Sequence, residues 1–301
     1  MGKQGLAYLG LIAAAIAWGA NFGFSRLGME SFDPVLFTLL RFGLSVPIFF
    51  LLLWWKEGSV GVPLRAALQL MAIGAVGITT LEIAVMYSIK YTTLANASLL
   101  NVAPWPIFTA IFAPLFMKEA FTARLAAGGA AAAVGVCLVI LGGGGGFDLS
   151  SQNMLGNLLA LSASIIGALY NLACMPLMRK YSALRVSTWT IMFGSLFMIP
   201  LTLHSWSKVE WAALGGSEYA VIGYNVAIAT VAAFVIWNAS MFKVGATRAN
   251  FFRYTVPFAA VVAGWIMFAE SISVWQLGGA ACMAGGLIWI STEKRGTTSA
   301  A

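Results

Sequence analysis

Polar and aromatic residues recur at helical spacing inside long apolar stretches of this sequence, which makes them candidates for binding a small molecule. Two such stripes follow intervals of three and four residues: Trp18, Asn21 and Ser25, and Ser98, Asn101 and Trp105. An indole offers stacking contact and an amide offers hydrogen bonds, a combination that suits an amino acid. Asn and Ser also bond one membrane helix to another, so interhelical contact is the alternative interpretation.

Three charged residues lie within apolar stretches, where a charge is costly and usually functional. Glu82 is a candidate site for an ammonium group or a proton, and the alternative is an ion pair with Arg41. Arg253 is a candidate anchor for a carboxylate. Alternatively, its long side chain reaches toward the nearer membrane boundary.

Signals of catalysis or metal binding are weak. The one histidine, His204, rules out an HExxH site, and no GxxxxGK[ST] phosphate loop occurs. Cys137, Cys174 and Cys282 lie in apolar stretches and are interpreted as packing residues. We therefore expect no enzyme, no cofactor and no metal site, since a membrane-embedded enzyme would require clustered acids or histidines.

The elements that must position these residues are membrane helices. The 301 residues are 60% hydrophobic and 9% charged, whereas soluble domains are about 25% charged. The net charge of +7 is dispersed between apolar stretches, which favours membrane orientation over nucleic-acid binding. The expected partners are a small-molecule substrate and membrane lipid, with no nucleic acid and no obligate protein partner.

Ten apolar stretches are long enough to cross a bilayer, which takes about 20 helical residues. They are 6–27, 35–55, 66–88, 92–117, 123–142, 154–178, 186–203, 218–242, 247–268 and 273–291. Asp33 before Pro34, Thr122 and Ser273 are helix-start signals. The sequence thus predicts an all-α integral membrane protein with ten transmembrane helices.

The basic residues predict the orientation, because cytoplasmic loops carry Lys and Arg in excess. Twelve lie on the side of the N-terminus: Lys3, Lys56, Arg65, Lys118, Arg124, Arg179, Lys180, Arg185, Lys243, Arg248, Lys294 and Arg295. The opposite side has three, Arg26, Lys90 and Lys208. We expect both termini in the cytoplasm and the chain in a bacterial inner membrane.

The two halves of the chain resemble each other at a shift of about 151 residues. The matched pairs are Pro106 with Pro257, Glu119 with Glu270, Asn21 with Asn171, and Phe42-Gly43 with Phe193-Gly194. Five stretches per half is an odd number, so the repeats 1–147 and 148–301 must face opposite ways, as in secondary transporters. Pro106 and Pro257 are candidate hinges, and a static kink is the alternative.

This organisation, with a proline thirteen residues before a glutamate near the end of each half, resembles the EamA-type branch of the drug/metabolite transporter superfamily. Within it, Leu81-Glu82-Ile83, Pro104-Trp105-Pro106 and Trp237-Asn238 resemble YddG-type exporters of aromatic and other amino acids. The resemblance implies a central cavity lined by the first, third, fourth, sixth, eighth and ninth helices. YddG-type members tend to carry an aromatic ring where this chain has Gly167, and Tyr170 one turn later could supply it.

We therefore expect a secondary transporter that exports amino acids, aromatic and other neutral ones favoured, by alternating access. The alternative is an exporter of drugs, organic cations or other small metabolites with the same fold. Small four-helix relatives that expel cations rely on a glutamate in their first helix, which this chain lacks. The predicted substrate-binding residues are Trp18, Asn21, Glu82, Asn101, Trp105, Tyr170, Asn171, Trp237, Asn238 and Arg253.

Overall fold

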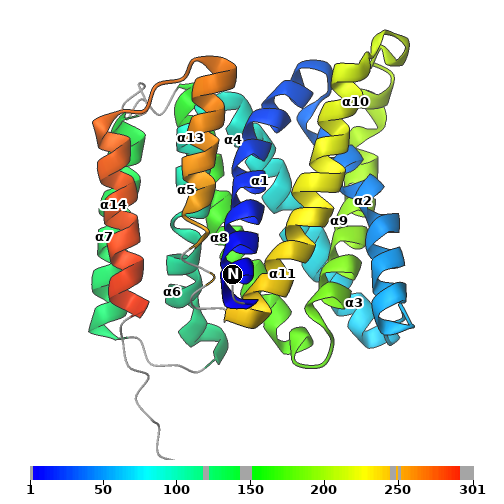
Figure 1. The fold of residues 1–301 in the computed structure, drawn as a ribbon, viewed down its shortest axis with the longest axis horizontal. Coiled ribbons are helices and arrows are strands. Elements are labelled where there is room, and N and C mark those ends of the chain that lie inside the picture. The colour runs from blue at the N-terminus through cyan, green and yellow to red at the C-terminus, as the bar shows by residue number, and fades with distance from the viewer. Residues whose placement is uncertain (1–2, 118–121, 143–150, 245–248, 250–251, 292–301) are drawn as a thin grey trace, which may run out of the picture.

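The computed structural model describes residues 3–117, 122–142, 151–244, 249 and 252–291, and every regular element in these ranges is a helix (Figure 1). The elements are α1 (Lys3–Ser31), α2 (Pro34–Glu57), α3 (Leu64–Ile73), η1 (Gly74–Thr79), α4 (Thr80–Tyr91), α5 (Leu94–Val102), α6 (Trp105–Met117), α7 (Ala123–Gly142), α8 (Gln152–Met178), α9 (Ala183–Trp206), η2 (Trp211–Ala213), α10 (Gly216–Gly223), η3 (Tyr224–Ala232), α11 (Ala233–Val244), α13 (Thr255–Phe268) and α14 (Val274–Ser291).

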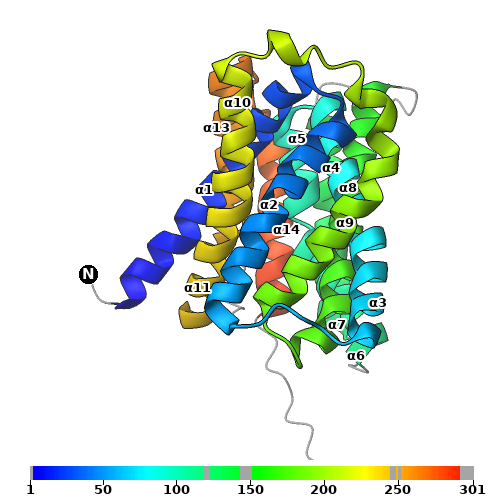
Figure 2. The same ribbon diagram turned by 90° about the vertical axis from the view of Figure 1, so that its right-hand side faces the viewer.

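Eight helical segments are long and apolar enough to cross a membrane, and they match the first eight predicted stretches. The apolar segments Thr255–Phe268 and Val274–Trp289 are shorter and match the last two stretches. In Figure 2 the helices run between two ends of the bundle, where the connections gather. Large apolar side chains such as Trp55 and Trp265 are exposed on the exterior, as lipid requires. The chain is an integral membrane protein.

Side chains fix the starts of several helices by capping them. Asp33, Thr122 and Ser273 each accept hydrogen bonds from backbone N–H groups in the first turn that follows. Pro34 occupies the first position of α2, where its missing N–H costs nothing. The start signals predicted from the sequence are thus confirmed at all three positions.

Buried amides join helices that are distant in the sequence. Gln276 Nε2 donates to Asn96 Oδ1 at 2.6 Å, and Asn96 Nδ2 donates to Asn157 Oδ1 at 2.9 Å. These bonds link α14, α5 and α8 through groups that would be costly if left unpaired in lipid. These three side chains therefore make contacts between helices, which is the alternative interpretation of polar residues in apolar stretches.

Two helices are interrupted near the middle of the bundle. Between α5 and α6 the chain leaves the helix at Ala103 and Pro104, and Pro104 and Pro106 both lack an N–H to continue the ladder. A turn at Arg253 and Tyr254 precedes α13. The Tyr254 hydroxyl donates to the Ala103 carbonyl at 3.1 Å, so the two interruptions contact each other.

Local features recur at the shift that the sequence suggests. The π-helical segments η1 and η3 lie in the third and eighth apolar stretches. In each, a threonine hydroxyl donates to the carbonyl five residues earlier, Thr79 to Gly74 and Thr230 to Asn225. Helix pairs recur as well, because α1 packs on α11 and α13 while α8 packs on α4, α5 and α6. The two halves therefore share these local structural features.

Candidate functional site

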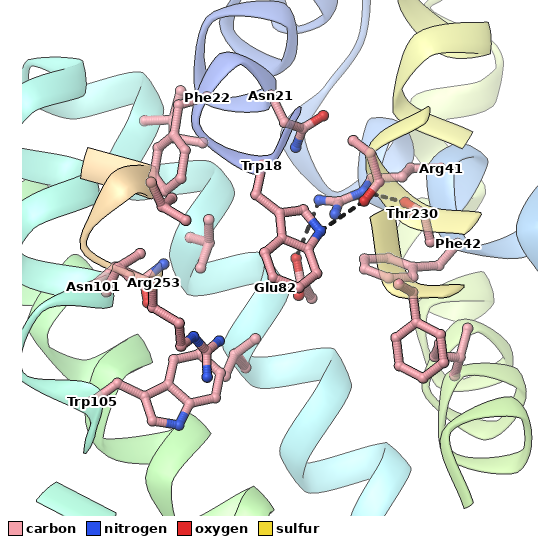
Figure 3. Close-up of a pocket in the computed structure, with 18 of the residues that line it drawn as sticks. Trp18, Asn21, Phe22, Arg41, Phe42, Glu82, Asn101, Trp105, Thr230 and Arg253 are labelled. Atoms are coloured by element: carbon pink, nitrogen blue, oxygen red, sulfur yellow. Dashed lines mark hydrogen bonds and ion pairs between the residues drawn. The ribbon is translucent and has the colours of Figure 1, made fainter. Parts of the chain in front are cut away.

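A cavity of about 220 Å³ lies between helices from both halves of the chain (Figure 3). Its lining comes from α1, α2, α4, α5, α6, α9, η3, α11 and the turn and helix at α13. Six predicted binding residues line it together: Trp18, Asn21, Glu82, Asn101, Trp105 and Arg253. The interrupted helices contribute Asn101, Trp105 and Arg253, as is typical of transporter sites built on broken helices.

The lining differs from the expected one in which helices take part. The resemblance implied the sixth helix, α8, but α8 supplies none of the lining residues. The reason is steric, since a Cβ on Gly167 would lie 2.4 Å from a Trp105 ring atom. The Trp105 indole therefore occupies the surface of α8 at this point, and α2 and α9 contribute to the wall instead.

Two indoles, Trp18 of α1 and Trp237 of α11, contact each other beside the cavity with their ring planes tilted by 47°. Trp18 Nε1 donates to the Ala229 carbonyl at 2.9 Å, which fixes the orientation of its ring. The Trp237 ring lies 5.0 Å from the Trp18 ring and is 7% exposed. Trp18 thus lines the cavity with a fixed orientation, and Trp237 packs against it without lining the cavity.

Glu82 and Arg41 form an ion pair on one side of the cavity, with 3.5 Å between Glu82 Oε2 and Arg41 Nη1. Arg41 Nε also donates to the Thr230 hydroxyl at 2.9 Å, and its guanidinium lies 4.6 Å from the Phe42 ring centroid. The ion-pair interpretation of Glu82 is therefore confirmed as a contact. The two side chains are 15% and 10% exposed, so each charge compensates the other in a largely dry setting.

Arg253 lies on the Trp105 ring, with 4.7 Å between the guanidinium carbon and the ring centroid. Within the described ranges, Arg253 has no ion-pair partner, and its Nε has no hydrogen-bond partner. Trp105 Nε1 and Asn101 Oδ1 are likewise buried without a partner there. Buried polar groups left unpaired cost about 1–3 kcal/mol each, so this corner is suited to a polar ligand.

The other four predicted binding residues do not line this cavity. The Tyr170 hydroxyl lies 2.9 Å from the Thr190 hydroxyl, within a cluster of α8, α9 and α3 side chains. Asn238 Nδ2 donates to the Phe234 carbonyl of its own helix at 2.8 Å. Asn171 is half-buried on α8, and Trp237 stands behind Trp18. The candidate hinges Pro106 and Pro257 are the second residue of α6 and the third of α13.

Several lining residues were not predicted because their types carry no local signal. Aromatic and aliphatic walls come from Phe22, Phe42, Phe49, Ile191 and Phe234. In a sequence this rich in apolar residues, a side chain that faces a cavity looks the same as one that faces lipid. Thr230 could have been found, because it matches Thr79 at the repeat shift.

An ion pair that the sequence did not predict ties three elements at the end of the bundle where α1 finishes. Arg26 pairs with Glu270 and also donates to the Ile89 and Thr92 carbonyls. Glu270 Oε2 accepts from the Leu94 N–H at 2.8 Å, which caps α5. Glu270 belongs to one of the residue pairs matched between the halves, and its counterpart Glu119 lies outside the described residues.

Comparison with known proteins places the chain among transporters. An uncharacterized transporter of Bacillus subtilis, YetK, is 27% identical over 97% of this chain and 89% of its own length. A protein of Streptantibioticus cattleyicolor named as a probable terminal-alkyne amino-acid exporter is 24% identical over 98% of this chain and 96% of its own. A solved crystal structure shares the fold, with a TM-score of 0.65 at 17% identity over 98% of this chain and 99% of its own.

The family model that matches is that of the EamA-like transporter family. It matches twice, over residues 5–141 and 154–292, so each half of the chain carries one copy of the family unit. The two matches together include every cavity-lining residue described above. This chain therefore belongs to the EamA-like transporter family.

Proposed function

We propose that the chain is a secondary transporter that exports amino acids, with aromatic and other neutral amino acids favoured. The observation that carries this proposal is a single cavity that joins indole walls with a carboxylate, two arginines and two amides. Apolar walls suit an amino-acid side chain, and the polar groups suit its charged ends. A relative named as a probable amino-acid exporter agrees with this substrate class.

The cavity disfavours organic cations, the alternative substrate. The lining holds two arginines and one carboxylate, and that Glu82 carboxylate already contacts Arg41, so the charge of the lining repels a cation. The volume of about 220 Å³ is below the roughly 300–1,000 Å³ of sites for drug-sized ligands. Both features favour a small metabolite that carries a carboxylate over a drug.

Alternating access would follow from two inverted repeats, 1–147 and 148–301. The recurring π-helical segments, the paired helix interruptions and the twofold family match support this duplication. In this proposal the repeats rock about the cavity, with Pro106 and Pro257 as hinges, and both termini face the cytoplasm of a bacterial inner membrane. The chain itself supplies the binding and the movement, without a cofactor.

The test is exchange of labelled substrates by the purified chain in proteoliposomes. A panel of neutral amino acids is compared with acidic amino acids and with organic cations, using protein-free liposomes as the blank. We expect exchange of neutral amino acids, and Trp105→Ala should impair it more for bulky than for small ones, since stacking contributes about 0.5–1.5 kcal/mol. Trp55→Ala is the matched control, because Trp55 is 80% exposed and lies outside the cavity. Exchange of cations alone would refute amino-acid export.

A further inference from the structure

The charges around the cavity do not cancel. Arg41 and Glu82 compensate each other, whereas Arg253 has no ion-pair partner within the part of the chain that the structure describes. The described lining therefore holds one positive charge in excess. An uncompensated charge in a largely apolar setting is unfavourable, and an anionic ligand would relieve it.

The geometry of Arg253 leaves its donors available to a planar anion. The guanidinium carbon lies 4.7 Å from the Trp105 ring centroid, a cation–π contact that uses none of the N–H groups of Arg253. Figure 3 places Arg253, Trp105 and Asn101 on one side of the cavity, away from Arg41 and Thr230 on the other. Asn101 is 5% exposed on the same side, and only its Nδ2 could donate to a carboxylate, because its Oδ1 is an acceptor.

Two helices begin beside this corner, and one helix ends there. α6 begins at Trp105, α13 begins directly after the turn of Arg253 and Tyr254, and α5 ends at Val102. The N-terminal ends of α6 and α13 carry a partial positive charge and the C-terminal end of α5 a partial negative one, so the full charge of Arg253 dominates the potential of the corner. The bond from Tyr254 to Ala103 holds the two helix interruptions together.

From these observations we propose that Arg253, supported by Trp105, is a carboxylate-binding subsite and that the carboxylate is the recognised end of the substrate. The Glu82 carboxylate stays with Arg41, so an ammonium group on the ligand is not required. The subsite deepens the proposed function and, for amino acids, rests on it. The ligand class is a small monocarboxylate with an apolar body.

The experiment uses two sets of ligands with matched bodies. Phenylalanine is compared with 3-phenylpropanoate, which lacks the amino group, and with phenethylamine, which lacks the carboxylate. Leucine is compared with 4-methylpentanoate and 3-methylbutylamine. Each ligand is tested as a competitor of labelled amino-acid exchange in proteoliposomes and as a stabiliser of the purified chain against thermal unfolding.

We expect both carboxylates to compete and to stabilise, and both amines to do neither. Arg253→Gln should weaken competition by the carboxylates about tenfold or more, because it removes charge-assisted hydrogen bonds. Arg253→Lys keeps the charge without the planar fork and should retain part of the binding. The control is Arg65→Gln, since Arg65 is exposed and lies outside the cavity lining.

The outcomes separate the two proposals. If amino acids are not exchanged but 3-phenylpropanoate stabilises the chain in an Arg253-dependent manner, the proposed function fails and the subsite stands. If amino acids are exchanged but the amines compete as well as the acids, the subsite is refuted and the proposed function stands. Equal affinity in wild type and in Arg253→Gln also refutes it. If Arg253→Gln fails to fold, two measurements still test the subsite. They are the competition by acids against amines in the wild-type chain and the binding of carboxylates by Arg253→Lys.

Discussion

At the scale of single residues, the cavity depends on a contact between a glycine and an indole. Gly167 has no side chain, and the Trp105 ring lies where its Cβ would be. The aromatic surface that was expected on the sixth transmembrane helix, α8, is thus supplied by Trp105 of α6. Tyr170, the alternative source of that ring, instead contacts Thr190 away from the cavity.

Gly167→Ala should therefore destabilise the chain and displace Trp105. A Cβ at 2.4 Å from the ring forces a shift that costs about 1–3 kcal/mol in a packed interior. We expect a lower midpoint of thermal unfolding and a changed tryptophan emission spectrum. Gly285→Ala is the control, because nothing lies within 4 Å of that Cβ position in α14. Adding Trp105→Phe, a smaller ring, should restore part of the stability.

The pair of Arg41 and Glu82 makes a second prediction at this scale. Glu82→Gln leaves the buried Arg41 charge without its partner, which costs about 3–5 kcal/mol in comparable sites. The variant should express poorly and unfold at lower temperature, and the double variant Arg41→Gln with Glu82→Gln should recover. A fully stable Glu82→Gln that loses only proton-driven accumulation would show instead that Glu82 exchanges protons.

At the scale of elements, the pair of Arg26 and Glu270 ties α1 to the turn between α4 and α5 and to the connection before α14. The Phe268 ring lies 5.1 Å from the Arg26 guanidinium carbon and partly shields the pair. Ile89, whose carbonyl accepts from Arg26, also lines the cavity. Separation of these elements would therefore open the cavity toward this end of the bundle.

Glu270→Gln should raise the accessibility of the cavity from this end. The change removes the ionic partner of Arg26 and weakens the cap on α5. In a background with the native cysteines replaced, a membrane-impermeant maleimide should label Ile89→Cys faster when Glu270→Gln is present. Glu210→Gln is the matched control, because Glu210 is exposed in the connection after α9. Unchanged labelling would show that the pair does not hold this end closed.

At the scale of the whole molecule, equivalent helices of the two halves make equivalent contacts. The pairs α2 with α9 and α7 with α14 each join equivalent helices of the two halves, and Figure 1 shows α7 and α14 together at one edge. Among the other helices, the most extensive contacts have an equivalent with the halves exchanged. The contact of α1 with α13, for example, corresponds to the contact of α8 with α5 and α6. In the proposed mechanism, such an arrangement would let two conformations of similar energy interconvert by exchanging the roles of the halves.

The predicted orientation of the molecule rests on the expectation that twelve basic residues lie on the side of the N-terminus and three on the opposite side. A C-terminal fusion to a fluorescent protein that folds only in the cytoplasm should fluoresce. A fusion to a phosphatase that is active only outside the cytoplasm should be silent. The reverse pattern would overturn the predicted topology and, with it, the inverted relation of the repeats.

The sequence by itself determined the lipid-facing nature of the chain, the position of its helices and its family. These properties depend on local sequence, because about 20 apolar residues, a capping Asp33 and the match of Pro106 with Pro257 need no knowledge of distant contacts. Glu82 and Arg253 were also evident, since any charge within an apolar stretch stands out.

Only the tertiary structure decided which of these groups meet. Whether Glu82 faces a substrate or Arg41 depends on the rotation of two helices about their axes, which helical spacing alone leaves open. The same holds for Tyr170, which points to Thr190, and for Trp105, which fills the space beside Gly167. A cavity is a gap shared by many elements, and its lining is therefore a property of their packing.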